Sequence, residues 1–421
     1  MRSLLGEAWL SASTLLVIIG LVGGSVILVG VGVLIVTLGG AARLWARLSL
    51  EEVVYERELA ERRAFVGERV ELRLRLANRK TLPVPWLEVR QQLPEALAVE
   101  GAHTTPSGVA GVVMLERTTS LAGHERVEWL ITLVASEHGY YRIGPTRLRS
   151  GDIFGIFDRE ETVAGGEALI VYPRTYPLDD LGLGSTRPFG ELRGGQRIFE
   201  DPVRVVGVRD YLPGDPLKRV DWKATARAGR LQSRLYEPSR TQSVVVALNI
   251  STMEHSWQGA NPVLLERGVV VAASIASWAF EAGFALGFVA NGSFPNADRP
   301  IRIGAGRRPD QLVHVLEALA MISPMTTSAL SEQLSRRRHT VPAGATLVVV
   351  TSRMPEELAA ALLRHREDGH DVHVVKTSSQ SWDVSLGDLP IVEIESRMQE
   401  IEREAAEPAA TGTAGASGVA R

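Results

Sequence analysis

The 421-residue sequence contains no cysteine. Disulfide bonds, thiolate nucleophiles, zinc–thiolate sites and iron–sulfur clusters are therefore excluded, although the absence of cysteine does not identify a cellular compartment. The chain also lacks the Gly-Lys-Ser or Gly-Lys-Thr triplet of a Walker A phosphate-binding loop. We therefore expect any nucleotide hydrolysis linked to this chain to be carried out by a partner protein.

An excess of charge of one sign is absent as well, since the chain has 46 basic and 49 acidic residues and a net charge of −3. Aromatic residues make up only 6% of the chain, and no basic stripe is interleaved with them. Nucleic acid is therefore not an expected partner. The sequence has no Gly-x-Ser-x-Gly elbow of a serine hydrolase either. Its length predicts two or three domains.

Charged residues are missing from Ala8 to Ala42. One helix needs about 20 residues to cross the hydrocarbon core of a bilayer, so this stretch is too long for one straight span. Glycines near its centre favour a reversal of the chain, namely Gly20, Gly23 and Gly24. We predict a transmembrane segment over residues 1–50, folded as a helical hairpin with spans at Trp9–Leu21 and Val26–Thr37. The alternatives are a single tilted span and a cleavable signal peptide.

Basic residues after the second span predict its orientation. Arg43 and Arg47 follow the span, with Trp45 between them as an interfacial anchor. Positive flanks favour the cytoplasmic side of a membrane, and in a hairpin Arg2 lies on that side too. We therefore expect a protein of the cell membrane whose soluble domains are cytoplasmic.

Residues 51–172 predict an antiparallel β-sandwich of the immunoglobulin-like type. Apolar and charged residues alternate strictly from Glu68 to Leu76, as in a strand with one face in water. Turn residues recur at short intervals, and no long helical pattern interrupts them. We interpret this domain as a spacer or an interaction module. Four aromatic residues are expected to pack under its end, namely Tyr140, Tyr141, Phe154 and Phe157.

Residues 173–201 are rich in glycine and are expected to form a mobile linker. From residue 202 to 394 strands alternate with helices, which is typical of a doubly wound α/β sheet. The predicted strands are Ser243–Ile250, Phe284–Ala290, Ala345–Thr351 and Asp371–Lys376. The predicted helices are Leu264–Ala282, Asp310–Ile322, Ser328–Arg338 and Glu356–Asp368.

Two further segments complete the chain. The apolar stretch Val269–Phe280 is too short for a membrane span and predicts a buried core helix. Residues 395–421 predict a short amphipathic helix followed, from Ala405, by a disordered tail.

Charged residues of both signs are concentrated from Val203 to Arg234. A Leu-Pro-Gly-Asp turn ends at Asp215, which would cap a short helix with Pro216 at its first position. Within that helix Asp215 and Arg219 would share a face. We name eight residues of this stretch the charged hub: Arg209, Tyr211, Gly214, Asp215, Arg219, Asp221, Trp222 and Arg227.

The charged hub has two interpretations. Alternating charges around a turn usually form a solvated ion-pair network, in which exposed pairs contribute about 0–1 kcal/mol each. The second interpretation is a structural junction or a docking face. Catalysis is not expected, because no nucleophile lies beside a base in this stretch.

Three sequence blocks resemble hallmarks of the DUF58 family, a family of uncharacterised domains. The blocks are Gly139–Pro145 continuing to Gly151–Phe157, then Val171–Arg174, and then the charged stretch with Arg209-Asp210-Tyr211, Pro213-Gly214-Asp215 and Asp221-Trp222-Lys223. The resemblance implies a membrane-anchored protein with a von Willebrand factor A-like domain. It also implies an association with AAA+ ATPases of the MoxR type.

In von Willebrand factor A domains, the carboxyl ends of the strands carry a metal site built on Asp-x-Ser-x-Ser, a distant Thr and a distant Asp. In this chain Asn249, Met253 and Ser352 stand where the first Asp, the second Ser and the later Asp are expected. Ser251 matches the motif, and the candidate distant threonines are Thr326 and Thr327. A hard divalent cation normally needs carboxylate ligands. We therefore expect no metal; the residues nearest to a magnesium set are Asn249, Ser251 and Thr326.

These patterns predict a non-catalytic, membrane-anchored scaffold or adaptor that presents the α/β domain to a MoxR-type AAA+ ATPase and its client. No cofactor is expected, and the lipid bilayer is the second expected partner. Three alternatives stay open. They are a magnesium-dependent adhesion module, an envelope-associated factor that works beside a transglutaminase-like enzyme, and a hydrolase with an unrecognised site.

Overall fold

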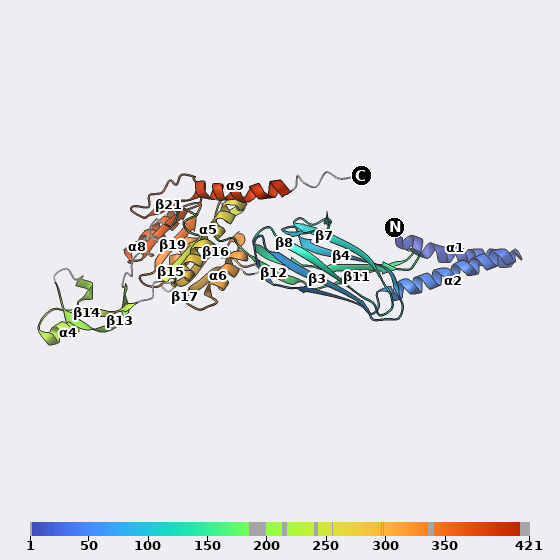
Figure 1. Cartoon of the computed structure of the whole chain (residues 1–421), viewed down its shortest axis with the longest axis horizontal. Helices are drawn as coiled ribbons and strands as arrows, with labels where there is room; N and C mark the ends of the chain where they lie inside the picture. Colours follow the sequence, from blue (N-terminus) through green and yellow to red (C-terminus); the bar gives the residue numbers. More distant parts are fainter. Residues whose placement is uncertain are drawn as a thin grey trace. The chain divides into compact units, whose positions relative to one another are not determined.

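The structure of the protein is a computed structural model in which two units can be distinguished (Figure 1). Unit 1 spans Met1–Tyr172, and unit 2 spans Pro173–Arg421. The structure describes residues 2–184, 199–212, 217–239, 243–254, 256–295, 297, 299–335 and 341–412.

Unit 1 begins with two helices, α1 (Arg2–Val22) and α2 (Val26–Ser49). The turn between them contains Gly24, whose φ of 65° lies in the region that favours glycine. The two helices pack closely against each other, because a Cβ atom on Gly32 would lie 2.5 Å from Cγ2 of Val17. Glycine at this position therefore allows the short approach between the helices.

Membrane insertion of these helices stays a prediction. Helix α2 is long and apolar enough to cross a bilayer, and most of its side chains are exposed. The core helix of a soluble protein or a signal sequence can have the same length and composition. The exposed apolar surface of α2 therefore indicates membrane association.

The rest of unit 1 consists mainly of strands. They are β1 (Val53–Leu59), β2 (Arg63–Phe65), β3 (Arg69–Asn78), β4 (Val84–Pro94), β5 (Leu97–Val99), β6 (Thr104–Pro106), β7 (Val112–Leu121), β8 (Arg126–Ala135), β9 (Gly139–Ile143), β10 (Thr146–Gly151), β11 (Asp158–Val163) and β12 (Glu167–Tyr172). Two antiparallel sheets have the orders β1-β3-β8-β5 and β11-β10-β4-β7-β6. A smaller mixed sheet has the order β2-β12-β9, in which β2 and β12 are parallel.

The two antiparallel sheets share a hydrophobic core. Residues from both sheets belong to one buried cluster, including Leu72 and Leu74 of β3, Leu93 of β4, Leu115 of β7 and Leu133 of β8. Burial in β3 alternates from residue to residue, and β3 pairs antiparallel with β1 and β8. The alternation from Glu68 to Leu76 therefore predicted this strand and its buried face correctly.

The loop between β10 and β11 differs from the expectation. Phe154 is 69% exposed, whereas Tyr140, Tyr141 and Phe157 are partly buried. The prediction that Phe154 packs under the end of the domain is therefore wrong. The physical reason is that the Asp152 carboxylate accepts hydrogen bonds from backbone amides of the loop and fixes a turn that leaves Phe154 outside.

The first part of the predicted mobile linker is packed within unit 2. The buried leucines of this segment are Leu178, Leu181 and Leu183. The amide of Tyr176 donates a hydrogen bond to Oγ of Ser274 at 2.9 Å. The linker prediction is therefore wrong for residues 173–184, because leucines between the glycines bury apolar surface. Residues 185–198 lie outside the described residues.

A seven-stranded sheet lies at the centre of unit 2. Its strands are β15 (Ser243–Leu248), β16 (Ala285–Ser293), β17 (Pro300–Gly306), β18 (Ser323–Thr326), β19 (Thr346–Thr351), β20 (Asp371–Lys376) and β21 (Ile391–Glu393). The order is β17-β16-β15-β19-β20-β21, and β18 also pairs with β16. The strands from β16 to β21 in this order are parallel, whereas β17 and β18 are antiparallel to β16.

Helices cover both faces of this sheet. They are α5 (Pro262–Glu281), α6 (Gln311–Ala320), α7 (Leu330–Ser335), α8 (Glu356–Glu367) and α9 (Glu395–Gly412). Ala247 of β15 shares a core with α7 and α8, whereas a Cβ on Gly268 of α5 would contact Leu248. Adjacent strand residues point to opposite faces. Helix α5 is mostly buried, which confirms the predicted core helix.

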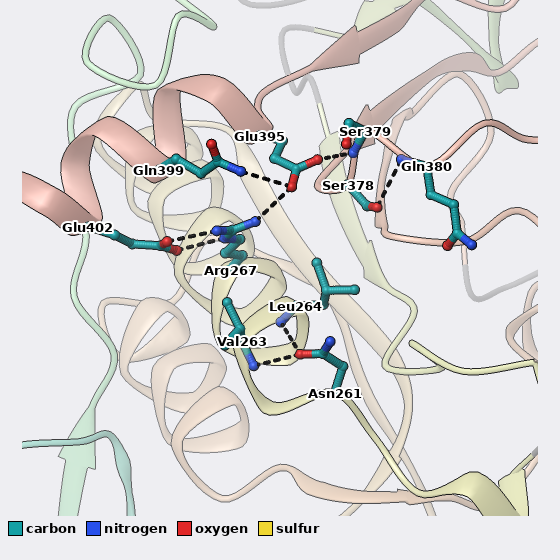
Figure 2. Close-up of polar contacts among 10 residues, drawn as sticks. All are labelled: Asn261, Val263, Leu264, Arg267, Ser378, Ser379, Gln380, Glu395, Gln399 and Glu402. Atoms are coloured by element: carbon teal, nitrogen blue, oxygen red, sulfur yellow. Dashed lines mark hydrogen bonds and ion pairs between the residues drawn. The ribbon is translucent and has the colours of Figure 1, made fainter.

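Helix α9 is attached to α5 through a buried arginine (Figure 2). Nε of Arg267 lies 2.7 Å from Oε1 of Glu402, and Nη1 lies 3.2 Å from Oε1 of Glu395. The hydrogen bond to Glu402 is the main cause of a raised pKa of the Arg267 guanidinium. The helix continues past Ala405 to Gly412, so the predicted tail is wrong for residues 405–412, where alanine and glutamate favour helix.

Candidate functional site

The charged hub lies on a two-stranded antiparallel ribbon. Its strands are β13 (Phe199–Asp210) and β14 (Gln232–Ser239). Between them the chain forms a short 3-10 helix, η1 (Leu217–Arg219), and the helix α4 (Trp222–Ala228). We call these four elements the ribbon. Residues 213–216 lie outside the described residues.

Asp221 connects α4 to β14. Its Oδ1 accepts hydrogen bonds from the amides of Lys223 and Ala224, each at 3.0 Å, which makes Asp221 the N-cap of α4. Its Oδ2 accepts a hydrogen bond from Nε of Arg234 at 3.1 Å. The hydrogen bond from the Ala224 amide, followed by the one from Arg234, lowers the pKa of the Asp221 carboxyl. The carboxylate is therefore charged at neutral pH and fully engaged in structural contacts.

Gln232 holds a second set of contacts in the ribbon. Its side-chain amide donates to Oδ1 of Asp210 at 2.6 Å, and its backbone amide donates to Oγ1 of Thr225 at 3.0 Å. Asp210 also pairs with Arg230, at 3.2 Å from its Nε. Gln232 is buried. Nothing in the sequence pattern marked Gln232, because its role depends on the pairing of two strands that are distant in the chain.

Apolar side chains of the ribbon, by contrast, are exposed. Trp222, the first residue of α4, is 68% exposed. The other exposed large apolar residues of the ribbon and its turns are Val205, Val208, Leu212, Leu217 and Leu231. Tryptophan is enriched at the centres of protein interfaces. The arrangement can therefore offer a docking surface, while the carboxylates of Asp210 and Asp221 are held by arginines.

The structure brings part of the charged hub together. Arg209 lies in β13, and Tyr211 directly follows this strand. Arg219 lies in η1, and Arg227 lies in the last turn of α4. Gly214 and Asp215 lie outside the described residues, so the predicted contact between Asp215 and Arg219 stays a prediction.

The start of the hub helix needs a correction. The sequence analysis placed a helix after Asp215, but residues 217–219 form a 3-10 turn and α4 begins at Trp222. The cap is Asp221, because the run that follows it contains no proline and ends at Gly229 in a left-handed conformation. The interpretation of Asp221 and Trp222 as neighbours in a charged surface missed this capping role.

A second polar site lies at the carboxyl ends of the central strands of unit 2. We call Asn249, Ser251, Asn291 and Thr351 the strand-end cluster. Nδ2 of Asn291 donates to Oδ1 of Asn249 at 2.9 Å and to Oγ of Ser251 at 3.1 Å. Nδ2 of Asn249 donates to Oγ1 of Thr351 at 3.0 Å. Asn291 was missed by the sequence analysis, although it directly follows the predicted strand Phe284–Ala290.

The polar atoms of the strand-end cluster are paired with one another and with the backbone, and all of these groups are neutral. Oδ1 of Asn291 accepts from the amide of Ile250 at 2.8 Å, so both amide oxygens and two hydroxyls already accept hydrogen bonds. Within the described residues no group of three or more His, Asp or Glu side chains could hold a metal ion. The cluster offers a cation amide and hydroxyl oxygens without carboxylate.

The other metal candidates lie around the same strand ends. Thr326 is on β18, opposite Gly292 of β16, and the amide of Thr327 donates to the carbonyl of Asn291 at 3.1 Å. Ser352 is buried and Met253 is exposed. The structure therefore places Asn249, Ser251 and the threonine segment near one another, with Asn291 between them.

Comparison with known sequences then identifies the family. The family model described as "Protein of unknown function DUF58" matches residues 207–406. Residues 207–406 of the chain therefore belong to the DUF58 family. The DUF58 match begins in β13 and extends into α9, so it includes α4, the strand-end cluster and Arg267. Unit 1 lies outside the matched residues.

The uncharacterized protein YeaD of Bacillus subtilis (strain 168) is similar to this chain, with 23% identity over 211 residues. The alignment covers 49% of this chain and 50% of YeaD, so the chain spans about half the length of this curated relative.

Solved structures show only low similarity. A cohesin module from a family 33 glycoside hydrolase of Clostridium perfringens is 11% identical, covering 28% of this chain and 97% of that chain, with a TM-score of 0.20. The sporulation control protein Spo0M of Bacillus subtilis is 9% identical, covering 31% of this chain and 53% of that chain, with a TM-score of 0.19. These likenesses carry no argument about function.

Proposed function

We propose that this DUF58 protein is a non-catalytic scaffold, tethered to the cell membrane, that docks a AAA+ ATPase of the MoxR type through the ribbon. The observation that carries the proposal is the exposure of Trp222 on a ribbon whose Asp210 and Asp221 carboxylates are held by arginines. A carboxylate held in this way is a poor general base, whereas an exposed tryptophan gains free energy when a partner covers it.

The polar contacts of the ribbon support a docking role further. The cap at Asp221 and the contacts of Gln232 hold α4 against β14, so Trp222 is presented on an ordered element. An interface residue that is already ordered loses less conformational entropy when it binds. The ribbon therefore has the properties of a preorganised docking surface.

Within this proposal, unit 2 is a von Willebrand factor A-like domain. The order β17-β16-β15-β19-β20-β21 corresponds to the third, second, first, fourth, fifth and sixth of these strands along the chain. This is the strand order of a doubly wound fold, in which successive strands are added first on one side of the first strand and then on its other side. The neutral strand-end cluster at that point supports a domain that binds its partner without a metal ion.

The proposal also assigns α1 and α2 to a membrane hairpin with the soluble units on the cytoplasmic side. Exposed apolar residues along α2 support insertion, and Arg43 and Arg47 favour a cytoplasmic end for α2. A MoxR-type ATPase has access to the ribbon only if unit 2 is cytoplasmic, because ATP is supplied there.

The proposal can be tested by pull-down with a MoxR-type ATPase encoded in the same genome. We expect Trp222→Ala to weaken binding about 30-fold, as for a central interface tryptophan worth about 2 kcal/mol. The matched control is Trp257→Ala on η2 (Ser256–Gln258), because Trp257 is 80% exposed in the same unit. Equal binding by wild type and a folded Trp222→Ala variant would overturn the proposal, and so would substrate turnover by the purified chain alone.

A further inference from the structure

An apolar loop of unit 1 is left outside the sandwich core. It joins β10 to β11, and residues 153–157 read Ile-Phe-Gly-Ile-Phe without a charged or polar side chain. Ile153, Phe154 and Ile156 are 62%, 69% and 61% exposed. Elsewhere in residues 51–172 the exposed large apolar side chains occur singly, namely Phe65, Val109 and Leu130. Single exposed residues are normal, whereas a cluster indicates a contact surface.

The exposed conformation of this loop is fixed by the fold. Asp152 is buried, and its carboxylate accepts hydrogen bonds from the amides of Phe154 at 2.6 Å, Ile156 at 3.3 Å and Phe157 at 2.5 Å. The carbonyl of Asp152 in turn accepts a hydrogen bond from the Trp86 indole at 2.9 Å. The apolar side chains are therefore held outward by buried polar contacts.

The loop lies beside the end of α2. Helix α2 contacts both β10 and β11, and Nη1 of Arg159 in β11 donates to the carbonyl of Arg47 at 2.8 Å. The last residue of the apolar stretch, Phe157, is two positions from Arg159. Nζ of Lys80 also donates to the carbonyl of Ser49 at 2.5 Å. The end of the sandwich that carries the apolar loop therefore also adjoins the last residues of the apolar helix α2.

We infer that residues 153–156 insert into the interfacial region of the bilayer and give unit 1 a second membrane contact beside α2. The inference rests on the proposed membrane anchoring of α1 and α2. The tip of the loop carries isoleucine and phenylalanine, and three exposed arginines lie nearby, namely Arg43, Arg47 and Arg159. Peripheral membrane anchors combine the same two features, because apolar side chains bind acyl chains and basic side chains bind anionic headgroups.

A lipid surface is the occupant that the position of the loop favours. If α2 enters the bilayer, its contacts with β10 and β11 hold the loop close to the level at which the chain leaves the lipid. A protein partner would have to displace lipid there. A second membrane contact would also limit the tilt of the sandwich, because the proposed hairpin adjoins the sandwich only at the end of α2.

Single cysteines can test the inference, because the chain has none of its own. Full-length Phe154→Cys, Leu34→Cys and Val109→Cys would be labelled with a fluorophore and placed in phosphatidylcholine vesicles containing phosphatidylglycerol. Leu34 is 56% exposed on α2 and reports the anchor itself. Quenching by phosphatidylcholine brominated in the upper part of its acyl chains then measures contact with lipid, and thermal unfolding checks that each variant is folded.

Val109→Cys is the matched control for the loop. Val109 is 62% exposed in the turn before β7. In the register of the sheet, Ser150 lies opposite Leu87 of β4, whereas Val112 lies opposite Pro94 at the other end of β4. The two labelled loops are therefore separated by roughly 25 Å along the strands, given about 3.4 Å per residue.

We expect the label at position 154 to be quenched about as strongly as the label at position 34, and several-fold more than the label at position 109. Quenching at position 34 without quenching at position 154 overturns the inference and leaves the membrane anchor intact. Absence of quenching at position 34 overturns the anchor and the inference with it. Equal quenching at positions 109 and 154 also overturns it, since contact with lipid would then not be a property of the loop.

Discussion

Two amide side chains meet near the carboxyl ends of the central strands of unit 2, and one of them, Asn249, stands where the expected metal motif has its first aspartate. Asn249 and Asn291 form a neutral pair, and each amide both donates and accepts. Replacing a carboxylate by an amide removes the charge that attracts a cation but keeps the shape and adds two donors. The two asparagines can therefore hold the ends of neighbouring strands together by hydrogen bonds alone.

Replacement of Asn291 by alanine tests how much these hydrogen bonds stabilise the fold. We expect Asn291→Ala to lower the free energy of unfolding by about 2 kcal/mol, because the Ile250 amide loses its acceptor and Oδ1 of Asn249 keeps only the hydrogen bond from the Ser251 amide. The measurement is urea unfolding of the full chain in detergent. Ser251→Ala is the control, because it removes one acceptor from a half-buried residue and should cost less than about 1 kcal/mol. Equal losses in the two variants would contradict a central role for Asn291.

Magnesium gives a second test at the residue scale. We expect millimolar magnesium to leave the melting temperature of the wild-type chain unchanged, because no carboxylate joins the described strand-end cluster and its oxygens already accept hydrogen bonds. A magnesium-dependent rise in melting temperature that Ser251→Ala abolishes would instead favour the adhesion-module alternative.

At the scale of elements, α9 depends on a carboxylate that is sensitive to acid. Burial alone would raise the pKa of the Glu395 carboxyl, but hydrogen bonds from Ser379 and the charge of Arg267 outweigh burial and leave the pKa below its ordinary value of 4.5. A carboxyl with a lowered folded pKa stabilises the fold above its unfolded pKa, and this stability is lost as pH falls through the folded pKa. Attachment of α9 should therefore weaken below about pH 4.5.

Glu395→Gln should flatten this acid dependence. We expect the variant to be less stable than wild type at neutral pH, with a difference that shrinks as the pH is lowered below the ordinary carboxyl pKa. Thermal unfolding from neutral pH to about pH 3 measures both effects. Glu400→Gln is the matched control, because Glu400 is exposed on the same helix and pairs with Arg397. If the stability of Glu395→Gln fell with decreasing pH as steeply as that of the wild type, Glu395 would not be the source of the acid dependence.

The elements of unit 2 differ in how far the sequence predicts them. Long apolar runs such as Ser243–Leu248 are buried on both faces, so composition alone indicates a central strand. The edge strand Pro300–Gly306 contains an arginine and two glycines and gives no such signal. The contacts of Gln232 depend on the register of β13 and β14, and those of Asn291 depend on three strands meeting at one edge. Neither kind of contact is visible in local patterns.

At the scale of the whole molecule, each described core cluster draws its residues from one unit. The core clusters of unit 1 combine β3, β4, β7 and β8, and that of unit 2 combines β15, β19, α7 and α8. Alternation and apolar runs predict these cores because burial follows from composition and period. The apolar loop at 153–156 shows the limit of such patterns, since its phenylalanine is exposed because of a buried carboxylate.

Separate cores predict that the two units unfold separately. Leu133 in unit 1 and Leu347 in unit 2 are both fully buried, and replacement of either by alanine should cost about 3 kcal/mol through the cavity left behind. In calorimetry of the full chain we therefore expect Leu133→Ala to lower one unfolding transition and Leu347→Ala to lower the other. If either variant lowered both transitions together, the units would be coupled. If the proposed ATPase binds the ribbon, coupled transitions would let it act on unit 1 as well, whereas separate transitions would confine its effect to unit 2.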